Sequence, residues 1–466
     1  MELRTTAGTA RGLDRDGLGL FLGLPYAHAP AGERRFAAPD PVRRWDGVRD
    51  ATRFGPAVPQ GPPAPGAPSP WDPQDGLGEL TLNVFTPDPG GAGLPVIVWL
   101  HGGAWVRGSP RMPLHDGGAL AAAGAVVVTV GFRIGAEGFL SLPGAPDDRG
   151  LRDQVAALTW VHDHIASFGG DPGRVTVAGQ SGGAASVAVL LAAPATEGLL
   201  HRAIAQSVHG GFRSPGEAAG VTARLAAALG VEPTPDGVAG VDPERLVAAQ
   251  DAPLRGPADG VSAFGPVIDG DVVVGQPWEG LARRPRPGVP LLATWTAQEA
   301  RAFPLPPAGS DPADVAAAFG LDRAAGAAYA ALADDPVELL VSDALHRLPT
   351  RWTARAHGGP TWTAELAWRS PLLGACHGLD VPLLLGTLGT RPAARMLGAP
   401  PPEEAAVVGA QLRRAWVAFA ATGDPGWPRH DLAGTTRRFD VTPSDVDDPL
   451  AASDAIWAQA RDRGVS

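Results

Sequence analysis

A strand, a tight turn and a helix follow one another directly within residues 175–193, VTVAGQSGGAASVAVLLAA. The apolar run 175–178 predicts a buried strand, and the small and aliphatic residues after the turn predict a buried helix. The turn at 179–183 has the pattern G-x-S-x-G, in which glycines let strand and helix pass closely and a serine sits at the apex. In a chain with 62 Gly the pattern alone could arise by chance. The prediction therefore depends on the strand before the turn and the helix after it. We predict that Ser181 is a nucleophile, with a helix N-terminus facing any negative charge that forms beside it.

Strands and helices alternate on both sides of this turn. Helical periodicity is clearest at 151–168 and 404–421. Further strands are predicted at 18–22, 79–85, 94–100, 125–130, 203–206, 289–294 and 361–367. Such alternation predicts an α/β fold, with a large, mostly parallel central sheet covered by helices on both faces.

The whole chain, 1–466, is expected to form one α/β unit. The Pro-rich stretch 56–73 is predicted to be a surface loop and not a domain boundary, because a strand of the main sheet follows it. Segments 215–260 and 305–345 are expected to be helical insertions, which together would form a lid or cap.

Charge and hydropathy exclude several classes of protein. The net charge of −11 argues against a nucleic-acid surface. The longest apolar runs have strand length and are too short to cross a bilayer. The first residues lack the apolar core of a signal peptide, and the single cysteine, Cys376, cannot form an intrachain disulfide. We expect a cytoplasmic monomer or weak homo-oligomer with no nucleic-acid or membrane partner.

Acyl transfer at a serine needs a base, an acid that orients the base, and donors for the oxyanion. The loop HGGAW, residues 101–105, directly follows the predicted strand at 94–100, and its glycines allow consecutive N–H groups to point together. The N–H of Gly182 would add another donor. One such donor contributes about 3 kcal/mol of transition-state stabilisation.

The base and the acid follow from chain order. His377, in GACHGLDVPLLLG, lies late in the chain, which suits the order serine, acid, histidine. Glu299, on a loop after a predicted strand, fits the acid; Asp269 lies in the same interval, although its Asp-Gly-Asp turn is more often structural. His162 and His164 are two residues apart on a helix and face different directions, which argues against a shared metal site. No metal or organic cofactor is expected.

Eight segments, in the same order along the chain, resemble the type-B carboxylesterases, the cholinesterase/carboxylesterase branch of the α/β-hydrolases, and a bacterial member in particular. They are LPYAHAPAGERRF, LTLNVFTP, VWLHGGAW, GFRIGAEGFL, GLRDQVAALTWVHDHIASFGGDPGRVTVAGQSGGAAS, FGPVIDGD, GACHGLDVPLLLG and WVAFAATGDPGW. The resemblance implies the α/β-hydrolase fold and favours Glu299 over Asp269. The residues it implies are Ser181 as nucleophile, Glu299 as acid, His377 as base, and Gly103, Ala104 and Gly182 as oxyanion donors.

Several positions depart from the family pattern. Gln180 precedes the nucleophile where the family commonly has Glu, and Gly182 follows it where Ala is more frequent. Asp148 stands where Asn is usual. Glu299 lies in a Gln-Glu-Ala context and not in the usual Asp-Glu-Gly. These departures concern the surroundings of the three candidate catalytic residues and leave those residues in place.

The sequence therefore predicts a serine carboxylic-ester hydrolase that acts through an acyl-enzyme on small to medium esters. Expected walls of the substrate pocket are Trp105, His209, Phe264 and Trp295. Cys376 is expected to be a small buried residue and not a reactive thiol. Two alternatives are hydrolysis of carbamate or amide bonds by the same residues, and a non-catalytic binding member of the family. The second is disfavoured because all three candidate catalytic residues are present.

Overall fold

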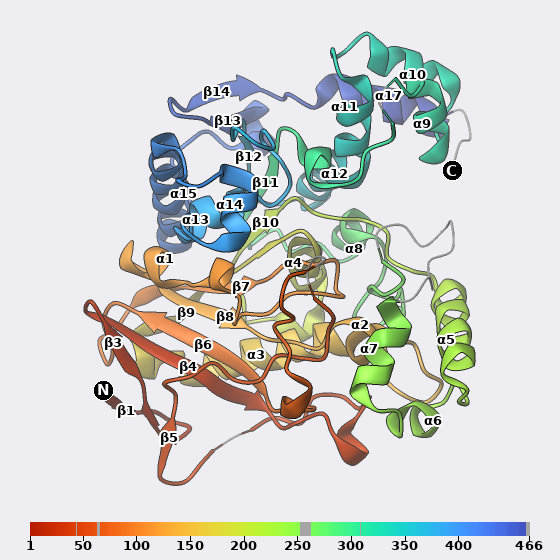
Figure 1. Ribbon diagram of the computed structural model, residues 1–466. Coiled ribbons are helices and arrows are strands. Elements are labelled where there is room, and N and C mark those ends of the chain that lie inside the picture. Colours follow the sequence, from red (N-terminus) through yellow and green to blue (C-terminus); the bar gives the residue numbers. More distant parts are fainter. Residues whose placement is uncertain (43, 63–65, 252–261, 308, 463–466) are drawn as a thin grey trace.

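The computed structural model describes residues 1–42, 44–62, 66–251, 262–307 and 309–462. These residues form a large twisted sheet with helices on both sides (Figure 1). The sheet has 11 strands in the order β14-β13-β12-β11-β10-β9-β7-β8-β6-β4-β3. Its strands are β3 Leu13–Arg15, β4 Leu18–Ala27, β6 Leu80–Thr86, β7 Leu94–Leu100, β8 Val126–Val130, β9 Gly170–Gln180, β10 Arg202–Gln206, β11 Leu291–Thr296, β12 Thr361–Leu366, β13 Thr435–Phe439 and β14 Ser444–Asp447.

The sheet is mixed: its central strands pair in parallel and its two flanks pair antiparallel. Every neighbouring pair from β8 through β13 is parallel, whereas β3–β4, β4–β6, β6–β8 and β13–β14 are antiparallel. Short turns join β3 to β4 and β13 to β14, and such turns are too short for the crossover that parallel neighbours need. A separate three-stranded sheet contains β1 Glu2–Arg4, β2 Thr9–Arg11 and β5 Val48–Asp50.

Two apolar cores cover the two faces of the sheet, and β7 contributes to both. Its residues Val96 and Val98 belong to the core that includes helices α3 (Arg149–His164) and α4 (Gly182–Ala192). Ile97 and Trp99 belong to the opposite core, with α1 (Gly118–Ala122), α13 (Asp380–Leu385) and α15 (Glu403–Thr422). Because successive side chains of a strand point to opposite faces, a continuous apolar run such as LPVIVWL suits a strand covered on both sides.

Two helical groups lie toward one side of the molecule in Figure 1. The first contains α5 Pro215–Leu229, α6 Pro235–Ala239 and α7 Pro243–Asp251; residues 252–260 of this predicted insertion fall outside the described residues. The second contains α9 Pro312–Ala318, α10 Arg323–Ala330, α11 Pro336–Ser342 and the C-terminal α17 Ala451–Asp462. A π-helical turn, η7 (Asp343–Arg347), joins α11 to α12 (Leu348–Ala356). That these groups are insertions in a single unit stays a prediction.

The predicted loop at 56–73 contributes to the interior of the protein. Within its described residues, Gln60 and Trp71 are buried. The Gln60 amide donates to the carbonyl of Gly108 at 2.9 Å and accepts from the Gly108 N–H at 2.9 Å. This pair of hydrogen bonds fixes the loop that follows residues 101–105.

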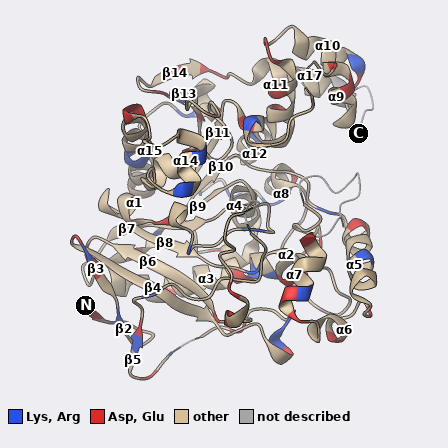
Figure 2. Ribbon diagram, viewed as in Figure 1, with Lys and Arg blue, Asp and Glu red and all other residues tan. Residues whose placement is uncertain are grey.

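Acidic and arginine residues are interspersed over the elements (Figure 2). Across the part of the chain that the structure describes, none of the helices combines the length and the apolar character needed to cross a bilayer.

Candidate active site

The nucleophile candidate sits where β9 ends and α4 begins. Ser181 has φ 58° and ψ −123°, a conformation that costs energy for a residue with a side chain. An added Cβ at Gly179 would lie 2.5 Å from the Gly183 carbonyl oxygen, and one at Gly183 would lie 2.2 Å from that of Leu100. Only glycine therefore fits these two positions of the turn. The Ser181 N–H donates to the Gln206 carbonyl at 2.8 Å, which ties the turn to the end of β10.

A carboxylate and an imidazole meet beside this turn. Glu299 begins the short 3-10 helix η6 (Glu299–Ala302), just after β11, and is fully buried. His377 Nδ1 lies 2.6 Å from Glu299 Oε2. The other carboxylate oxygen, Oε1, accepts from Ser207 Oγ at 2.6 Å and from the Thr296 N–H at 2.8 Å. Because the carboxylate accepts the Nδ1 hydrogen, the Nε2 of neutral His377 carries a lone pair.

The side-chain amide of Gln180 occupies that lone pair. Gln180 Nε2 lies 3.0 Å from His377 Nε2, so the amide is the donor and the imidazole the acceptor. Among the described residues, no hydrogen bond joins the Ser181 hydroxyl to His377. Such a bond often tightens only when substrate binds. The accepting nitrogen of the candidate base, His377, is thus engaged by Gln180, the residue before the candidate nucleophile.

The loop after β7 lies beside Ser181, since an added Cβ at Gly102 would be 3.2 Å from the Ser181 Cβ. Gly103 has φ 118°, and an added Cβ there would lie 2.0 Å from the Arg107 carbonyl oxygen, so the position requires glycine. Ala104 also has a positive φ, of 52°. An added Cβ at Gly182 would lie 3.4 Å from the Ala104 nitrogen, which places the two donors of loop and helix side by side. In the described part of the chain the N–H groups of Gly103 and Ala104 make no hydrogen bond, so they are available to an oxyanion.

The imidazole of His101 supports this loop from behind. His101 is buried and its ring stacks on Phe132, with centroids 4.4 Å apart. Burial lowers the pKa of His101 to about 4. The side chain is therefore an uncharged packing group at neutral pH and is not the base.

Three of the four predicted pocket residues lie together. The Trp105 indole donates to Ser186 Oγ at 3.2 Å, and its ring lies 5.9 Å from that of His209. Burial lowers the pKa of His209 to about 4, so this ring is uncharged at neutral pH. Phe264 is buried, and its neighbour Gly265 faces the Trp105 ring, 3.4 Å from an added Cβ. Trp105 also lies against the turn, because an added Cβ at Gly182 would be 3.4 Å from its ring. That these residues line a substrate pocket stays a prediction.

Trp295, the fourth predicted pocket residue, lies in a different cluster from the other three. Its indole donates to Glu365 Oε1 at 3.2 Å, and its ring packs with Leu348 and Leu450. The next residue, Thr296, donates its backbone N–H to Glu299. Successive side chains of a strand point to opposite faces, so the side chains of Trp295 and Thr296 lie on different faces of β11. The predicted strand, 289–294, ends just before Trp295. The sequence pattern therefore does not indicate on which face of the strand its indole lies.

The alternative acid and the lone thiol lie in structural settings. Asp269 Oδ1 accepts from the N–H groups of Asp271 and Val273 at 2.9 and 3.0 Å, the pattern of a turn. Burial raises the pKa of Cys376 to about 12, which keeps it a thiol. No cluster of three or more His, Cys, Asp or Glu suited to a metal ion occurs in the described ranges.

Sequence reasoning missed three residues around the pair Glu299–His377. Ser207 follows β10 directly and binds the carboxylate; its place at a strand end beside β9 was a usable signal. His346 stacks on His377 with ring centroids 4.0 Å apart, yet no motif surrounds it in the sequence. Asp380 accepts from Gln206 Nε2 at 2.7 Å, and burial, together with the charge of Glu299, raises its pKa to about 6.

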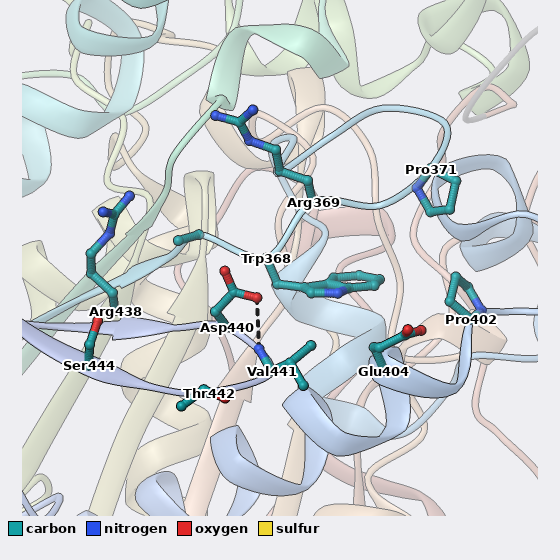
Figure 3. A pocket seen from close by; sticks show the side chains of 11 residues that line it. Trp368, Arg369, Pro371, Pro402, Glu404, Arg438, Asp440, Val441, Thr442 and Ser444 are labelled. Carbon is teal, nitrogen blue, oxygen red and sulfur yellow. Dashed lines mark hydrogen bonds between the residues drawn. The ribbon is translucent and has the colours of Figure 1, made fainter.

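A surface cleft of about 650 Å³ is lined by residues after β12 and around β13 and β14 (Figure 3). Trp368 lies in it. Two basic residues, Arg369 and Arg438, and two acidic residues, Glu404 and Asp440, also line it. None of the candidate catalytic residues lines this cleft, and its charges balance, so it is separate from the site described above.

Comparison with known proteins identifies the family of this chain. The model of the carboxylesterase family matches residues 1–307. The chain belongs to the carboxylesterase family. It shares the α/β-hydrolase fold of that family and is an enzyme of the carboxylic-ester hydrolase class.

Individual relatives match over nearly the whole chain. The para-nitrobenzyl esterase of Bacillus subtilis is 34% identical over 450 residues, which cover 91% of this chain and 92% of the relative. The phenmedipham hydrolase of Pseudarthrobacter oxydans is 35% identical, covering 90% of each. Among solved structures, a thermophilic para-nitrobenzyl esterase superposes with a TM-score of 0.86 at 32% identity, covering 98% of this chain and 99% of that one. A Geobacillus stearothermophilus carboxylesterase gives 0.84 at 34% identity and the same coverage.

Proposed function

We propose that this carboxylesterase cleaves small to medium carboxylic esters by a Ser-His-Glu triad and an acyl-enzyme. His377 takes the Ser181 proton as the hydroxyl oxygen attacks the ester carbonyl, and Glu299 stabilises the imidazolium. The N–H groups of Gly103, Ala104 and Gly182 bind the oxyanion. The protonated His377 gives its proton to the leaving alcohol, and then activates the water that hydrolyses the acyl-enzyme.

The observation that carries this proposal is the 2.6 Å contact between His377 Nδ1 and Glu299 Oε2 beside the strained Ser181 turn. A buried carboxylate whose two oxygens are both engaged holds the ring in one tautomer. Before Ser181 can transfer its proton, the Gln180 amide must release His377 Nε2. The proposed first event on substrate binding is therefore a change of hydrogen-bond partner at this nitrogen.

A second candidate is hydrolysis of carbamate or amide bonds by the same residues. It is favoured by the similarity to an enzyme named for phenmedipham, at an identity as high as that to the para-nitrobenzyl esterase. The two candidates share the attack by Ser181 and differ in the leaving group and in the breakdown of the acyl-enzyme.

The test is a series of p-nitrophenyl esters of increasing acyl length, together with a p-nitrophenyl carbamate and an anilide, on the wild type and Ser181→Ala. We expect kcat to fall at least about 10³-fold in Ser181→Ala with every substrate. Equal activity of the two proteins would refute the proposal.

A matched pair of variants tests the acid. The kcat of Glu299→Gln should fall about 10²-fold or more, whereas that of Asp269→Asn should stay close to the wild type. The reverse result would assign the acid to Asp269.

A further inference from the structure

A second histidine lies flat against the proposed base. The ring centroids of His346 and His377 are 4.0 Å apart with an interplanar angle of 22°. His346 comes from η7 and is 2% exposed. Phe303 completes the group, with its ring 5.1 Å from His377 and 5.7 Å from His346. The mechanism proposed above uses neither of these additional rings.

One hydrogen bond fixes the tautomer of His346, and burial of the ring disfavours its charged form. Its Nδ1 lies 3.1 Å from the carbonyl oxygen of Ser207, which can only accept, so Nδ1 carries the hydrogen. Its Nε2 is buried and has no hydrogen-bond partner among the described residues. Burial, and next the charge that His377 can carry, hold the pKa of His346 well below its ordinary value. The ring is therefore uncharged at neutral pH.

The backbone of His346 is tied to the same segment that holds the acid. The His346 carbonyl accepts from Thr350 Oγ1 at 2.7 Å, and that oxygen accepts from the Val208 N–H at 2.8 Å. The neighbouring Ser207 donates its hydroxyl to Glu299 at 2.6 Å. The two residues after β10 thus fix Glu299 through a side chain and His346 through the backbone, so the His346 ring is placed relative to both Glu299 and His377.

We propose that His346 is a positioning residue for the base: its uncharged ring is the surface that sets the tilt of His377. The proposal rests on the triad proposed above. Glu299 holds the Nδ1 edge of His377. Once the Gln180 amide has released Nε2, a ring held at that one edge can still tilt about the remaining hydrogen bond. A flat neighbour at 4.0 Å removes this freedom. When His377 becomes an imidazolium, its positive charge lies over the face of an aromatic ring, a favourable arrangement.

Two substitutions separate the ring face from the hydrogen bond to Ser207. His346→Phe keeps a flat ring and loses the Nδ1 donor, whereas His346→Asn keeps an N–H donor and loses the ring. His357→Asn is the matched control, because His357 is equally buried but bonds the Val289 carbonyl, which precedes β11, at 2.6 Å. We expect kcat for p-nitrophenyl butyrate to fall about 10- to 100-fold in His346→Asn with KM within about threefold. His346→Phe should stay within about fivefold of the wild type, and His357→Asn should keep its kcat.

The rate of Ser181 sulfonylation by phenylmethylsulfonyl fluoride gives a second readout, because it depends on the same base. It should fall in His346→Asn in parallel with kcat.

The inference is overturned if kcat falls as much in His346→Phe as in His346→Asn, or if the effect of His346→Asn is on KM or equals that of His357→Asn. If His346→Phe does not fold, His346→Ala with added imidazole replaces it: restored kcat supports the inference and no restoration overturns it. If Ser181→Ala stays active, the triad itself has failed; if Ser181→Ala is inactive while His346→Asn is fully active, only the present inference has failed.

Discussion

At the scale of single residues, Gln180 is a hydrogen-bond partner of the proposed base, His377. Its amide donates to His377 Nε2, and its side-chain oxygen lies 2.6 Å from an added Cβ at Gly102. The Gln180 side chain therefore contacts both Gly102, next to the proposed oxyanion donors, and His377. The glutamate that is common in the family at this position would instead place a negative charge beside that nitrogen, and an opposite charge favours an imidazolium.

Gln180→Glu should move the acid limb of the kcat/KM profile to higher pH. An opposite charge within about 4–6 Å changes proton affinity by about one pH unit or more, so activity should be lost earlier as the solution is acidified. The measurement is kcat/KM for p-nitrophenyl acetate from pH 5 to 9. Gln180→Leu is the control, because it removes the donor without adding a charge and should shift the limb much less. An unchanged limb in Gln180→Glu would show that this side chain does not interact with the base in solution.

At the scale of elements, the strands that position the site could be predicted, whereas β13 and β14, at one edge of the sheet, could not. The apolar runs of β7, β8 and β9 and the turn at Ser181 follow from hydrophobic pattern and glycine placement alone. The short strands β13 and β14 carry polar sequences, TTRRF and SDVD, with no periodicity that distinguishes them from a loop. His346 was not predictable because stacking across the site depends on how η7 packs on η6, which no local pattern encodes.

The start of α3 holds a buried acid where the family commonly has an amide. Asp148 has φ 55° and ψ 37°, a left-handed conformation that Asn and Asp adopt most readily after Gly. Its Oδ1 accepts from the Val267 N–H at 2.9 Å, and its Oδ2 is buried without a partner among the described residues. Burial, with the charges of Asp269 and Asp147 acting in the same direction, raises the pKa of Asp148 well above its ordinary value.

Asp148→Asn should therefore stabilise the protein at alkaline pH. A carboxyl group with a raised pKa in the folded state contributes most below its unfolded pKa of about 4, and that contribution is lost as the pH rises toward the folded value. Asn keeps the acceptor for Val267 and does not ionise, so the gain should appear at pH 8 and vanish near pH 4. Thermal unfolding measures it, with about 2 °C in Tm expected for each kcal/mol. Exposed Asp236→Asn is the control; a gain for Asp148→Asn that is the same at both pH values would contradict this explanation.

At the scale of the whole molecule, the C-terminal helix α17 connects α12 with the outer helix α10. Arg351 of α12 forms ion pairs with Asp448 and Asp454, and Arg355 reaches Asp454 at 2.7 Å. The Trp352 indole donates to the second oxygen of Asp454 at 2.7 Å. Farther along α17, the Trp457 indole donates to the Tyr329 hydroxyl of α10 at 2.8 Å. The last helix therefore contacts both α12, which continues from the turn bearing His346, and the outer helices.

Asp454→Ala should lower the free energy of unfolding by about 2 kcal/mol or more, because it leaves a buried guanidinium with one partner fewer. Urea unfolding of the full chain measures the loss. Asp445→Ala is the control, since its pair with Arg437 lies at the surface and such pairs contribute about 0–1 kcal/mol. The kcat of Asp454→Ala at 25 °C should remain that of the wild type, because Asp454 is bonded to α12 and not to the proposed triad. A loss of kcat in protein that is still fully folded would instead show that the docking of α17 is transmitted through α12 to His346, which would make the C-terminal helix part of the support of the base.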